Sequence, residues 1–428
     1  MVGVARDGRL VWQAGRGTLD GTPDGQPPTV QTQYRIGSIT KTFTAVLVLQ
    51  LCDAGAVDLD DRLDRHLDDT PFGGTLIRDL LSHAAGLAAE PPGLWWERAP
   101  GLPWPELAAG FGDDQRLGPA GRFHYSNLGY ALLGEVVSRR AGMSWYAALR
   151  NRLLDPLGLN RTADRPTGPA APGLAVHPFA DVLQAEVVQD HGAMAPAGLL
   201  WSTVADLARW AAFLTGDTAG LLSETSLSQM QLSQAAVDGD IGYGLGLQLW
   251  SADGRRIVGH GGSVPGFVAS LVVDVQRGTA AIELANTTAG RPFCGIELLD
   301  LLERCEPTIV DPWVAAATPP SGWAELVGLW HWGPAPYLLR LVGTDRLELT
   351  PAVGEGRVSS FRRSGDAWTG VDGYMAGEPL VAIRRSDGSV GHLDIGTFVF
   401  TRLPYDPDAP IPGGAPADPW GARREAPS

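Results

Sequence analysis

The stretch Tyr34-Arg35-Ile36-Gly37-Ser38-Ile39-Thr40-Lys41-Thr42-Phe43 runs directly into the apolar segment 44–52. Gly37 and Ser38 precede an apolar run of helical length that ends near Gly55. The sequence therefore predicts a buried helix with Ser38 at or within one turn of its N-terminus. Lys41 follows three residues later, on the same helical face. A hydroxyl and an amine are thus expected within reach of each other, in the positive field of a helix N-terminus.

Lys41 is the only lysine in a chain that has 33 Lys and Arg residues. An arginine stays protonated in a protein, whereas a desolvated lysine can lose its proton and act as a base. The Ser38–Lys41 pair therefore has the geometry of an activated nucleophile. The alternative is a serine N-cap followed one turn later by an exposed lysine, and the spacing alone leaves both interpretations open.

Length, composition and charge limit the classes of protein and of partner that fit this sequence. At 428 residues the chain is long enough for two domains with a large core. Its 44% apolar and 19% charged residues are typical of a soluble globular protein. A formal net charge of -15 argues against nucleic acid and anionic membrane surfaces as partners. A small-molecule substrate is the expected partner, and the oligomeric state is not encoded in any pattern that we can interpret.

Cysteine content and terminal pattern bear on compartment and cofactors. Cys52, Cys294 and Cys305 are too few and too scattered for a disulfide framework or a zinc site, so no cofactor or metal is expected. No basic-apolar-small leader pattern opens the chain, and no apolar run reaches the ~18 residues of a membrane span. As written, the protein is expected to be cytoplasmic. Residues 2–12 already belong to a predicted strand-turn-strand, which leaves open a start further upstream.

Periodicity predicts an α+β fold. Residues 2–5 and 9–14 form a predicted β-hairpin with Asp7-Gly8 at its turn. From about residue 241 several short strands follow one another closely, which favours an antiparallel sheet. The predicted helices are 144–157, 203–214 and a closing helix at 292–304. We divide the chain into a domain at 1–306, a linker at 307–320, a small all-β barrel at 321–404 and a disordered tail at 405–428.

Three loops carry polar or aromatic residues that invite functional interpretations. The connection 58–66 is charge-rich, and its carboxylates are interpreted as solvated rather than catalytic. His83, within Ser82-His83-Ala84-Ala85-Gly86-Leu87, is interpreted as a buried loop-stapling histidine, with a catalytic base as the alternative. The Pro-, Gly- and Trp-rich residues 88–120 either line a substrate site or pack as a hydrophobic loop.

Tyr125 and Asn127 lie immediately before a helical pattern, in the segment Phe123-His124-Tyr125-Ser126-Asn127. From this position the phenol of Tyr125 can project into a cleft. The alternative is a hydrophobic staple at Tyr125, with Ser126 or Asn127 as the N-cap. The spacing Gly242-x-Gly-x-Gly246 is a weak dinucleotide-binding pattern, and we reject it because a strand follows it.

Three motifs now stand in order: Ser38-x-x-Lys41, Tyr125-x-Asn127 and His260-Gly261-Gly262. Together they resemble the penicillin-recognising serine hydrolases, in the branch of class C β-lactamases, D-Ala-D-Ala carboxypeptidases, D-aminopeptidases and β-lactamase-like esterases. The resemblance covers roughly residues 1–305 and implies a β-lactamase/transpeptidase-like fold, an antiparallel sheet flanked by helices with a helical subdomain. Further landmarks are the segments 82–87 and 196–202. The Ser-Asp-Asn motif of class A enzymes is absent. The C-terminal domain resembles the lipocalin-like barrel of some of these hydrolases.

The resemblance implies roles for the first two motifs. Ser38 is the expected nucleophile, which forms an acyl-enzyme that water hydrolyses. Lys41 and Tyr125 are expected to share the proton transfers, with the charge of Lys41 lowering the pKa of the phenol into a usable range. Asn127 is expected to donate to the substrate amide or to orient Lys41.

The resemblance also implies roles at the third motif. His260, Gly261 and Gly262 are expected on the strand beside the cleft, and the N–H groups of Ser38 and Ser263 are expected to form the oxyanion hole. Many relatives have Lys-Thr-Gly at this motif, so this chain lacks a permanent cation there. The expected substrates are small esters, amides or D-amino-acid peptides. A binding or sensor protein that keeps the fold without turnover is the competing hypothesis.

Overall fold

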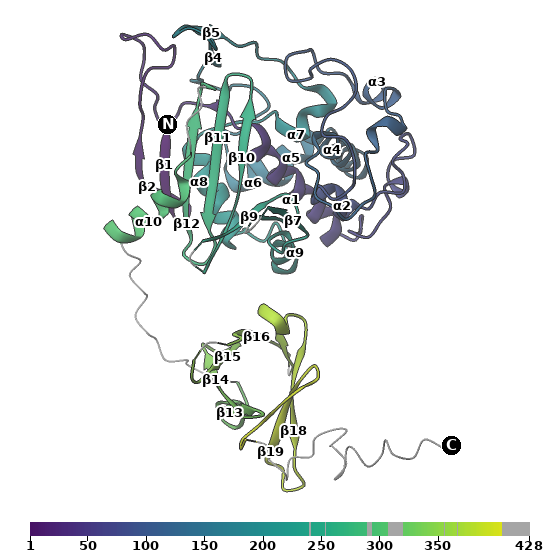
Figure 1. The fold of residues 1–428 in the computed structure, drawn as a ribbon, viewed down its shortest axis with the longest axis vertical. Coiled ribbons are helices and arrows are strands. Elements are labelled where there is room, and N and C mark those ends of the chain that lie inside the picture. Colours follow the sequence, from purple (N-terminus) through teal and green to yellow (C-terminus); the bar gives the residue numbers. More distant parts are fainter. Residues whose placement is uncertain are drawn as a thin grey trace. The chain divides into compact units, whose positions relative to one another are not determined.

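The computed structural model describes residues 1–238, 241–252, 254–288, 293–306, 320–354, 356–365 and 367–404. The chain divides into two compact units, Met1–Ile309 and Val310–Ser428 (Figure 1). The predicted linker, apart from its last residue, and the predicted tail 405–428 lie outside the described residues. The two units are therefore considered separately.

The N-terminal unit is organised by an eight-stranded antiparallel sheet with the order β2-β1-β12-β11-β10-β9-β8-β7. The predicted N-terminal hairpin is confirmed, and it joins the sheet through the pairing of β1 with β12. The short strands predicted from about residue 241 begin with β8 and β9, and between them Gly246, with a φ of +81°, turns the chain. The strands are β1 Val2–Arg6, β2 Arg9–Ala14, β7 Ala235–Asp238, β8 Ile241–Tyr243, β9 Gln248–Ala252, β10 Arg255–Val264, β11 Phe267–Asp274 and β12 Thr279–Ala285.

Helices cover both faces of this sheet, with α8 on one and α10 on the other (Figure 1). Alternate residues of β11 show this: Leu271 and Val273 belong to the main core, while Val272 packs in a smaller cluster with Leu299 of α10. The helices are α1 Thr40–Asp53, α2 Ile77–Leu81, α3 Trp104–Ala109, α4 Asn127–Ala141, α5 Trp145–Leu149, α6 Asp155–Leu157, α7 Ala195–Gly198, α8 Val204–Thr215, α9 Glu224–Met230 and α10 Gly295–Cys305.

The remaining elements are short. The predicted helix 144–157 is continuous but contains a π-helical segment, η4, between α5 and α6. Two small two-stranded sheets pair β3 with β6 and β4 with β5. The π-helical segment is η4 Arg150–Leu154. The bounds of the small strands and of the 3₁₀ turns are β3 Tyr34–Arg35, β4 Leu174–Val176, β5 Leu183–Ala185, β6 Trp201–Ser202, η1 Gly37–Ile39, η2 Leu63–Arg65, η3 Asp113–Gln115 and η5 Gly192–Met194.

Helix α1 lies in the unit's core. Every residue from 40 to 49 is buried, and the helix packs against α4 and α7. The turn η1 leads straight into α1, so Ser38 lies one turn before the buried helix, as predicted. None of the helices in the described part of the chain has both the length and the apolar character needed to span a lipid bilayer.

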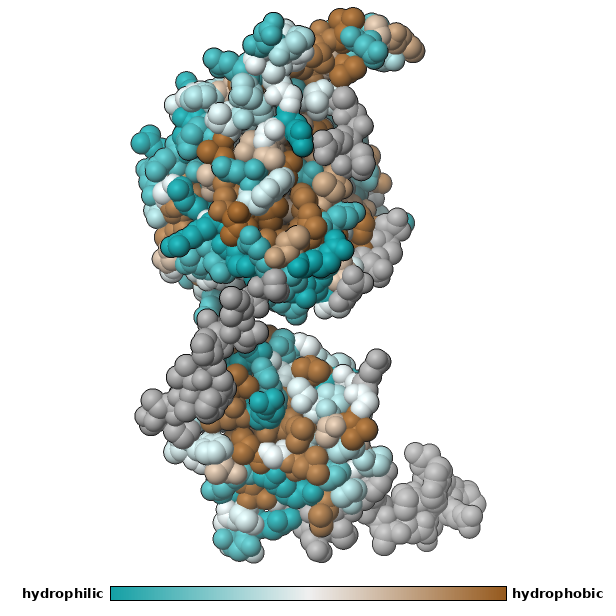
Figure 2. All heavy atoms as spheres, turned by 90° about the vertical axis from the view of Figure 1, so that its left-hand side faces the viewer, coloured by the Kyte–Doolittle hydropathy of each residue, from teal (hydrophilic) through white to brown (hydrophobic). Residues whose placement is uncertain are grey.

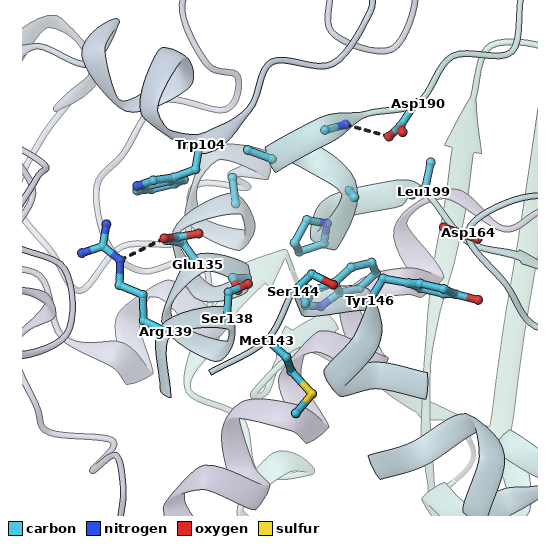
Figure 3. A pocket seen from close by; sticks show the side chains of 17 residues that line it. Trp104, Glu135, Ser138, Arg139, Met143, Ser144, Tyr146, Asp164, Asp190 and Leu199 are labelled. Carbon is cyan, nitrogen blue, oxygen red and sulfur yellow. Dashed lines mark hydrogen bonds and ion pairs between the residues drawn. The ribbon is translucent and has the colours of Figure 1, made fainter. Parts of the chain in front are cut away.

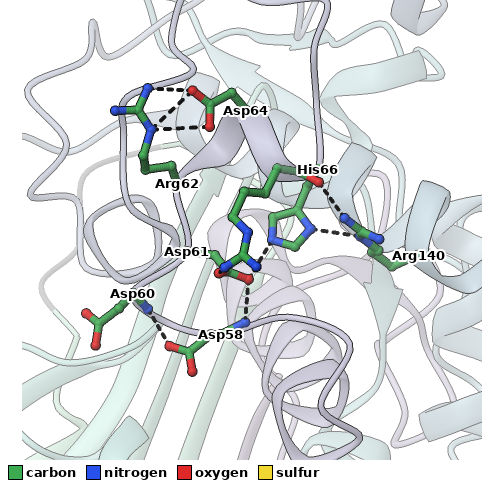
Figure 4. A network of polar contacts seen from close by, with 8 residues as sticks. Asp58, Asp60, Asp61, Arg62, Asp64, His66 and Arg140 are labelled. Carbon is green, nitrogen blue, oxygen red and sulfur yellow. Dashed lines mark hydrogen bonds and ion pairs between the residues drawn. The ribbon is translucent and has the colours of Figure 1, made fainter.

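In the charge-rich connection 58–66 the interpretation of the carboxylates as solvated was wrong for Asp61. Asp61 is only 7% exposed, and its Oδ2 lies 3.0 Å from Nε2 of His66 (Figure 4). Arg140, from the C-terminal end of α4, donates to Nδ1 of the same ring at 2.7 Å. Because the guanidinium can only donate, the proton of a neutral His66 ring is on Nε2 and is donated to Asp61. The network connects this loop to α4.

Apolar side chains gather on the face of the N-terminal unit that carries β2 and α10 (Figure 2). Trp12 and Leu301 are about half exposed there, and the groove between them has a volume of about 220 Å³. This groove lies beside the edge strand of the sheet.

The C-terminal unit is a closed eight-stranded antiparallel barrel. Pairing of β20 with β13, at Thr401 and His331, closes the ring. Trp330, Phe361 and Leu393 are fully buried in its core. The elements are α11 Trp323–Leu326, β13 Gly328–Trp332, β14 Ala335–Val342, β15 Arg346–Pro351, β16 Ser359–Ser364, β17 Ala367–Gly370, η6 Gly373–Met375, β18 Pro379–Arg384, β19 Val390–Ile395 and β20 Phe398–Thr401. The predicted small all-β barrel is confirmed.

Candidate active site

Three segments that are far apart in the sequence meet around Ser38: the turn η1, the N-terminal end of α4 and the second half of β10. Ser38 is partly exposed, whereas Lys41, in the first turn of α1, is fully buried. The Nζ atom of Lys41 lies 3.0 Å from Oγ of Ser38. The predicted proximity of hydroxyl and amine is thus present in the structure.

The amine of Lys41 has two further contacts, at 2.7 Å to Oδ1 of Asn127 and at 2.7 Å to the carbonyl of Ala197. The Asn127 amide donates through Nδ2 to Glu90 at 2.7 Å, and since an ionised carboxylate can only accept, this contact fixes which end of the amide faces Lys41. Both contacts therefore accept hydrogens from Lys41. When Lys41 is neutral, its two hydrogens serve these two oxygens, and the lone pair is left for Ser38.

Because Lys41 is buried, its neutral form is populated near physiological pH. Desolvation lowers the pKa of Lys41 from its ordinary value to about 7, against a smaller raising effect from the carboxylates of Glu90 and Glu97. Both carboxylates belong to the Trp-rich loop 88–120, which the sequence left open as a site-lining or a packing segment. The indole of Trp96 donates to Glu90 at 2.6 Å and holds that carboxylate in place.

Tyr125 differs from the sequence-based expectation. Burial raises the pKa of its phenol well above the ordinary value, and a hydrogen bond with Ser38 lowers it only in part. The expected lowering by the charge of Lys41 is not among the effects on this pKa, and Tyr125 stays protonated near neutral pH. The amine of Lys41 lies 4.9 Å from the centre of the Tyr125 ring. Tyr125 is thus placed to donate or relay a proton, while Lys41 is the stronger candidate for the base.

The motif His260-Gly261-Gly262 lies on the part of β10 that is not paired with β9. Strand β9 pairs with β10 only as far as Gly259, so residues 260–264 have no β9 partner among the described residues. This half of the strand packs on the backbone of η1 instead. A Cβ at Gly262 would lie 2.0 Å from the carbonyl oxygen of Ile36, and a Cβ at Gly37 would lie 2.7 Å from the backbone nitrogen of Ser263. Glycine at both positions allows the two backbones to approach.

Gly37→Ala is expected to destabilise the fold more than Gly55→Ala. Both glycines have left-handed backbones, with φ of +49° and +68°, so each substitution carries a strain of roughly 1–3 kcal/mol. A Cβ at Gly55 meets nothing within 4 Å, whereas one at Gly37 meets the backbone of β10. We expect a further loss of roughly 1–3 kcal/mol for Gly37→Ala in urea unfolding. Equal losses would show that η1 does not closely contact β10.

His260 is buried, with 2% of its surface exposed. Desolvation, with a further contribution from the charge of Lys41, lowers its pKa to about 3, so the ring is neutral. Its Nε2 contacts the hydroxyl of Tyr243 at 2.9 Å, and its Nδ1 lies 2.5 Å from the carbonyl of Gly261. The amide of Gly261 donates to the side chain of Gln248 at 3.0 Å. The edge of the strand therefore presents no cation.

The sequence interpretation missed several residues of this arrangement. Glu90 and Trp96 lie in an irregular loop where no periodicity marks individual residues. Ala197 contributes only a carbonyl, which any residue provides. Tyr243 lies within a stretch that we considered for its glycines alone. None of these positions carries a sequence signal except Glu90 and Trp96, whose loop was recognised as a candidate site-lining segment.

A large cavity is separate from this arrangement. It has a volume of about 550 Å³ and lies beside α4, α5 and α7, where it is lined by Trp104, Glu135, Arg139 and Tyr146 among others (Figure 3). Ser38 and Lys41 are not among its lining residues. In the described ranges no three His, Cys, Asp or Glu side chains are grouped so that they could hold a metal ion.

The comparison with protein families agrees with this architecture. The family model described as "Beta-lactamase" matches residues 1–302. The chain belongs to the beta-lactamase family. A second model, described as "Domain of unknown function (DUF7586)", matches residues 319–402 of this family member. The specific likeness of the barrel to lipocalins stays a prediction.

Individual relatives extend the comparison. Beta-lactamase-like protein 2 of Dictyostelium discoideum is 29% identical over 267 residues, which are 58% of this chain and 48% of that protein. This member of the beta-lactamase family thus spans about half the length of that relative. A D-aminopeptidase of Brucella anthropi is 23% identical over 97% of this chain and 81% of its own. The octameric penicillin-binding protein homologue from Pyrococcus abyssi has a TM-score of 0.63 at 21% identity, covering 93% of this chain and 94% of its own, which shows the shared fold.

Proposed function

We propose that the chain is a serine hydrolase that acts through an acyl-enzyme on small esters, amides or D-amino-acid-containing peptides. One observation carries the proposal: Lys41 has two fixed hydrogen-bond acceptors, so its remaining direction, toward Ser38 at 3.0 Å, holds the lone pair when the amine is neutral. A pKa of about 7 makes that neutral form abundant. Family membership and a D-aminopeptidase relative support it further.

The proposed reaction begins when Lys41 takes the proton of Ser38 and Oγ bonds to the substrate carbonyl carbon. The electron pair of the carbonyl moves to its oxygen, which the N–H groups of Ser38 and Ser263 would stabilise. When the bond to the leaving group breaks, that group receives the proton from Lys41 through the hydroxyl of Tyr125. Water then attacks the acyl carbon and gives up a proton along the same route, and Ser38 regains its own proton as the acid departs.

The charges around the site favour certain substrates. His260 is neutral and Gly261 has no side chain, so a substrate carboxylate finds no cationic partner at this edge of β10. Glu90 and Glu97 add negative potential near Lys41. Substrates with an uncharged or amino-bearing group are therefore preferred over those that carry a carboxylate.

The test is a panel of p-nitrophenyl esters, D-amino-acid anilides and a chromogenic cephalosporin, together with a fluorophosphonate probe. We expect turnover of esters or anilides that exceeds turnover of the cephalosporin, and labelling on the peptide that contains Ser38. If neither turnover nor labelling occurs, the hydrolase proposal is overturned and a binding role remains.

The kcat/KM of the wild type is expected to rise with pH through about 7. The base works only when it is neutral, and the neutral fraction of Lys41 grows as pH passes its pKa. Glu97→Gln removes a carboxylate that raises this pKa, so the acidic limb of the profile is expected to move to lower pH. Glu106→Gln, on α3, is not among the groups that shift the Lys41 pKa and is expected to leave the limb in place. A pH-independent rate across this range would contradict the role of Lys41.

A further inference from the structure

A chain of hydrogen bonds lies behind the candidate site and connects two of its sides, the N-terminal end of α4 (the α4 wall) and the second half of β10 (the β10 wall). The backbone N–H of Ser126 donates to Nδ1 of His83 at 3.0 Å, and Nε2 of His83 lies 3.1 Å from the hydroxyl of Tyr243. That hydroxyl lies 2.9 Å from Nε2 of His260, whose Nδ1 contacts the carbonyl of Gly261. His83, Tyr243 and His260 are each at most 2% exposed.

The two ends of the chain determine where every hydrogen lies. A backbone N–H can only donate, so Nδ1 of His83 is an acceptor and its ring hydrogen is on Nε2. A backbone carbonyl can only accept, so His260 carries its hydrogen on Nδ1 and its Nε2 is an acceptor. The hydroxyl of Tyr243 then accepts from His83 and donates to His260. The neighbouring hydroxyl of Tyr130 gives its own hydrogen to Leu81, so toward Tyr243 it is only an acceptor. Burial lowers the pKa of both histidines, which agrees with two neutral rings.

The ends of the chain are also the two sides of the site. Ser126 is the N-cap of α4, where its hydroxyl accepts from Gly129, and it lies between Tyr125 and Asn127. Gly261 lies two residues before Ser263 on the free edge of β10. His83 is therefore linked to the segment that carries the phenol and the amide, and through Tyr243 to the segment that carries the second proposed oxyanion donor.

We infer that His83 and Tyr243 are positioning residues that hold the α4 wall and the β10 wall of the site in register through this hydrogen-bonded chain. A continuous and fully satisfied buried network resists displacement more than separate contacts do. Proton donors in a transition state act over short distances, so a small shift of Ser263 relative to Tyr125 lowers the rate of the chemical step. Neither His83 nor Tyr243 touches the reacting atoms.

Two variants break the same link from opposite sides. Tyr243→Phe removes only the hydroxyl. His83→Asn keeps an acceptor near the Ser126 amide and suits the left-handed backbone at this position, where φ is +58°, but cannot reach Tyr243. We expect each variant to lower kcat about tenfold or more with KM changed less than about threefold, and the double variant to be no worse than the more impaired single variant.

A matched control is Thr162→Val, which removes another buried hydroxyl and keeps the shape of the side chain. That hydroxyl lies 2.9 Å from Oγ of Ser202 and donates to Asp206 at 2.9 Å, and neither partner belongs to the hydrogen-bonded chain. It is expected to lower the unfolding temperature by a similar amount as Tyr243→Phe without the same loss of kcat. Equal kcat losses, unchanged kcat in folded Tyr243→Phe and His83→Asn, or additive losses in the double variant would each overturn the inference.

A spectroscopic measurement tests the chain without any substrate. In long-range ¹H–¹⁵N spectra of the wild-type protein at neutral pH, His83 is expected as the Nε2–H tautomer and His260 as the Nδ1–H tautomer, with His83→Asn used for assignment. A cationic ring or the opposite tautomer at either position overturns the inference, even if the variants fail to fold. The kinetic measurements rest on the proposed hydrolase function, whereas this one does not, so the two failures are distinguishable.

Discussion

Ser38→Ala is expected to lower kcat/KM toward esters and anilides by roughly 10⁴-fold or more, because it removes the atom that forms the acyl bond. The substitution deletes one oxygen from a partly exposed side chain, so the fold is expected to persist. Labelling by the fluorophosphonate probe is expected to disappear with turnover. Both are measured on the same purified protein, with the unfolding temperature as a check on folding.

Ser138→Ala provides the comparison for Ser38→Ala. Its hydroxyl donates to the carbonyl of Gly134 within α4 and lines the separate cavity of Figure 3. It is expected to leave turnover close to wild type. If Ser38→Ala retained wild-type turnover, or if the probe labelled the Ser38→Ala protein equally well, another residue would be the nucleophile.

Lys41→Arg is expected to lower kcat/KM by roughly 10²- to 10⁴-fold, which is the usual contribution of a general base. The guanidinium keeps a positive charge and keeps donors for Asn127 and Ala197, but it cannot give up a proton. The acidic limb near pH 7 is expected to vanish together with the activity, since the titrating group is gone.

Lys41→Met separates the loss of the base from the loss of the charge. Methionine has a similar length but no hydrogens to donate, so Oδ1 of Asn127 and the Ala197 carbonyl lose a partner. We expect a comparable fall in kcat/KM and a lower unfolding temperature than in Lys41→Arg. Near-wild-type turnover in Lys41→Arg would show that deprotonation of this residue is not needed.

The parts of the site that lie close together in the chain were predictable. Ser38 and Lys41 are three residues apart at the start of a helix, and helical geometry alone brings such residues together. The helix after Tyr125 followed from a local pattern in the same way, and its cap, Ser126, was one of the two residues considered for that position. The antiparallel sheet and the barrel followed from short strands separated by turn residues. These predictions needed no knowledge of distant contacts.

Other features depended on partners that are distant in the sequence. The amide of Asn127 is oriented by Glu90, 37 residues away. The pKa of Tyr125 is raised by burial, not lowered by Lys41, because the desolvation depends on how many segments cover the ring. Asp61 was expected in solvent and is instead buried against His66, whose ring accepts a hydrogen bond from Arg140. Each of these outcomes depends on packing that no local pattern encodes.

The amino-acid sequence by itself determined which chemical groups the chain can bring to a reaction: one deprotonatable amine, a serine at the start of a buried helix, and glycines that allow two backbones to meet. Local rules of helix and strand geometry are enough for that. Only the tertiary structure decided the protonation states and the direction of each hydrogen bond, from neutral Lys41 to the chain through His83, Tyr243 and His260. The physical reason is that desolvation and acceptor placement arise where α1, α4 and β10 pack together, from segments that are distant in the sequence.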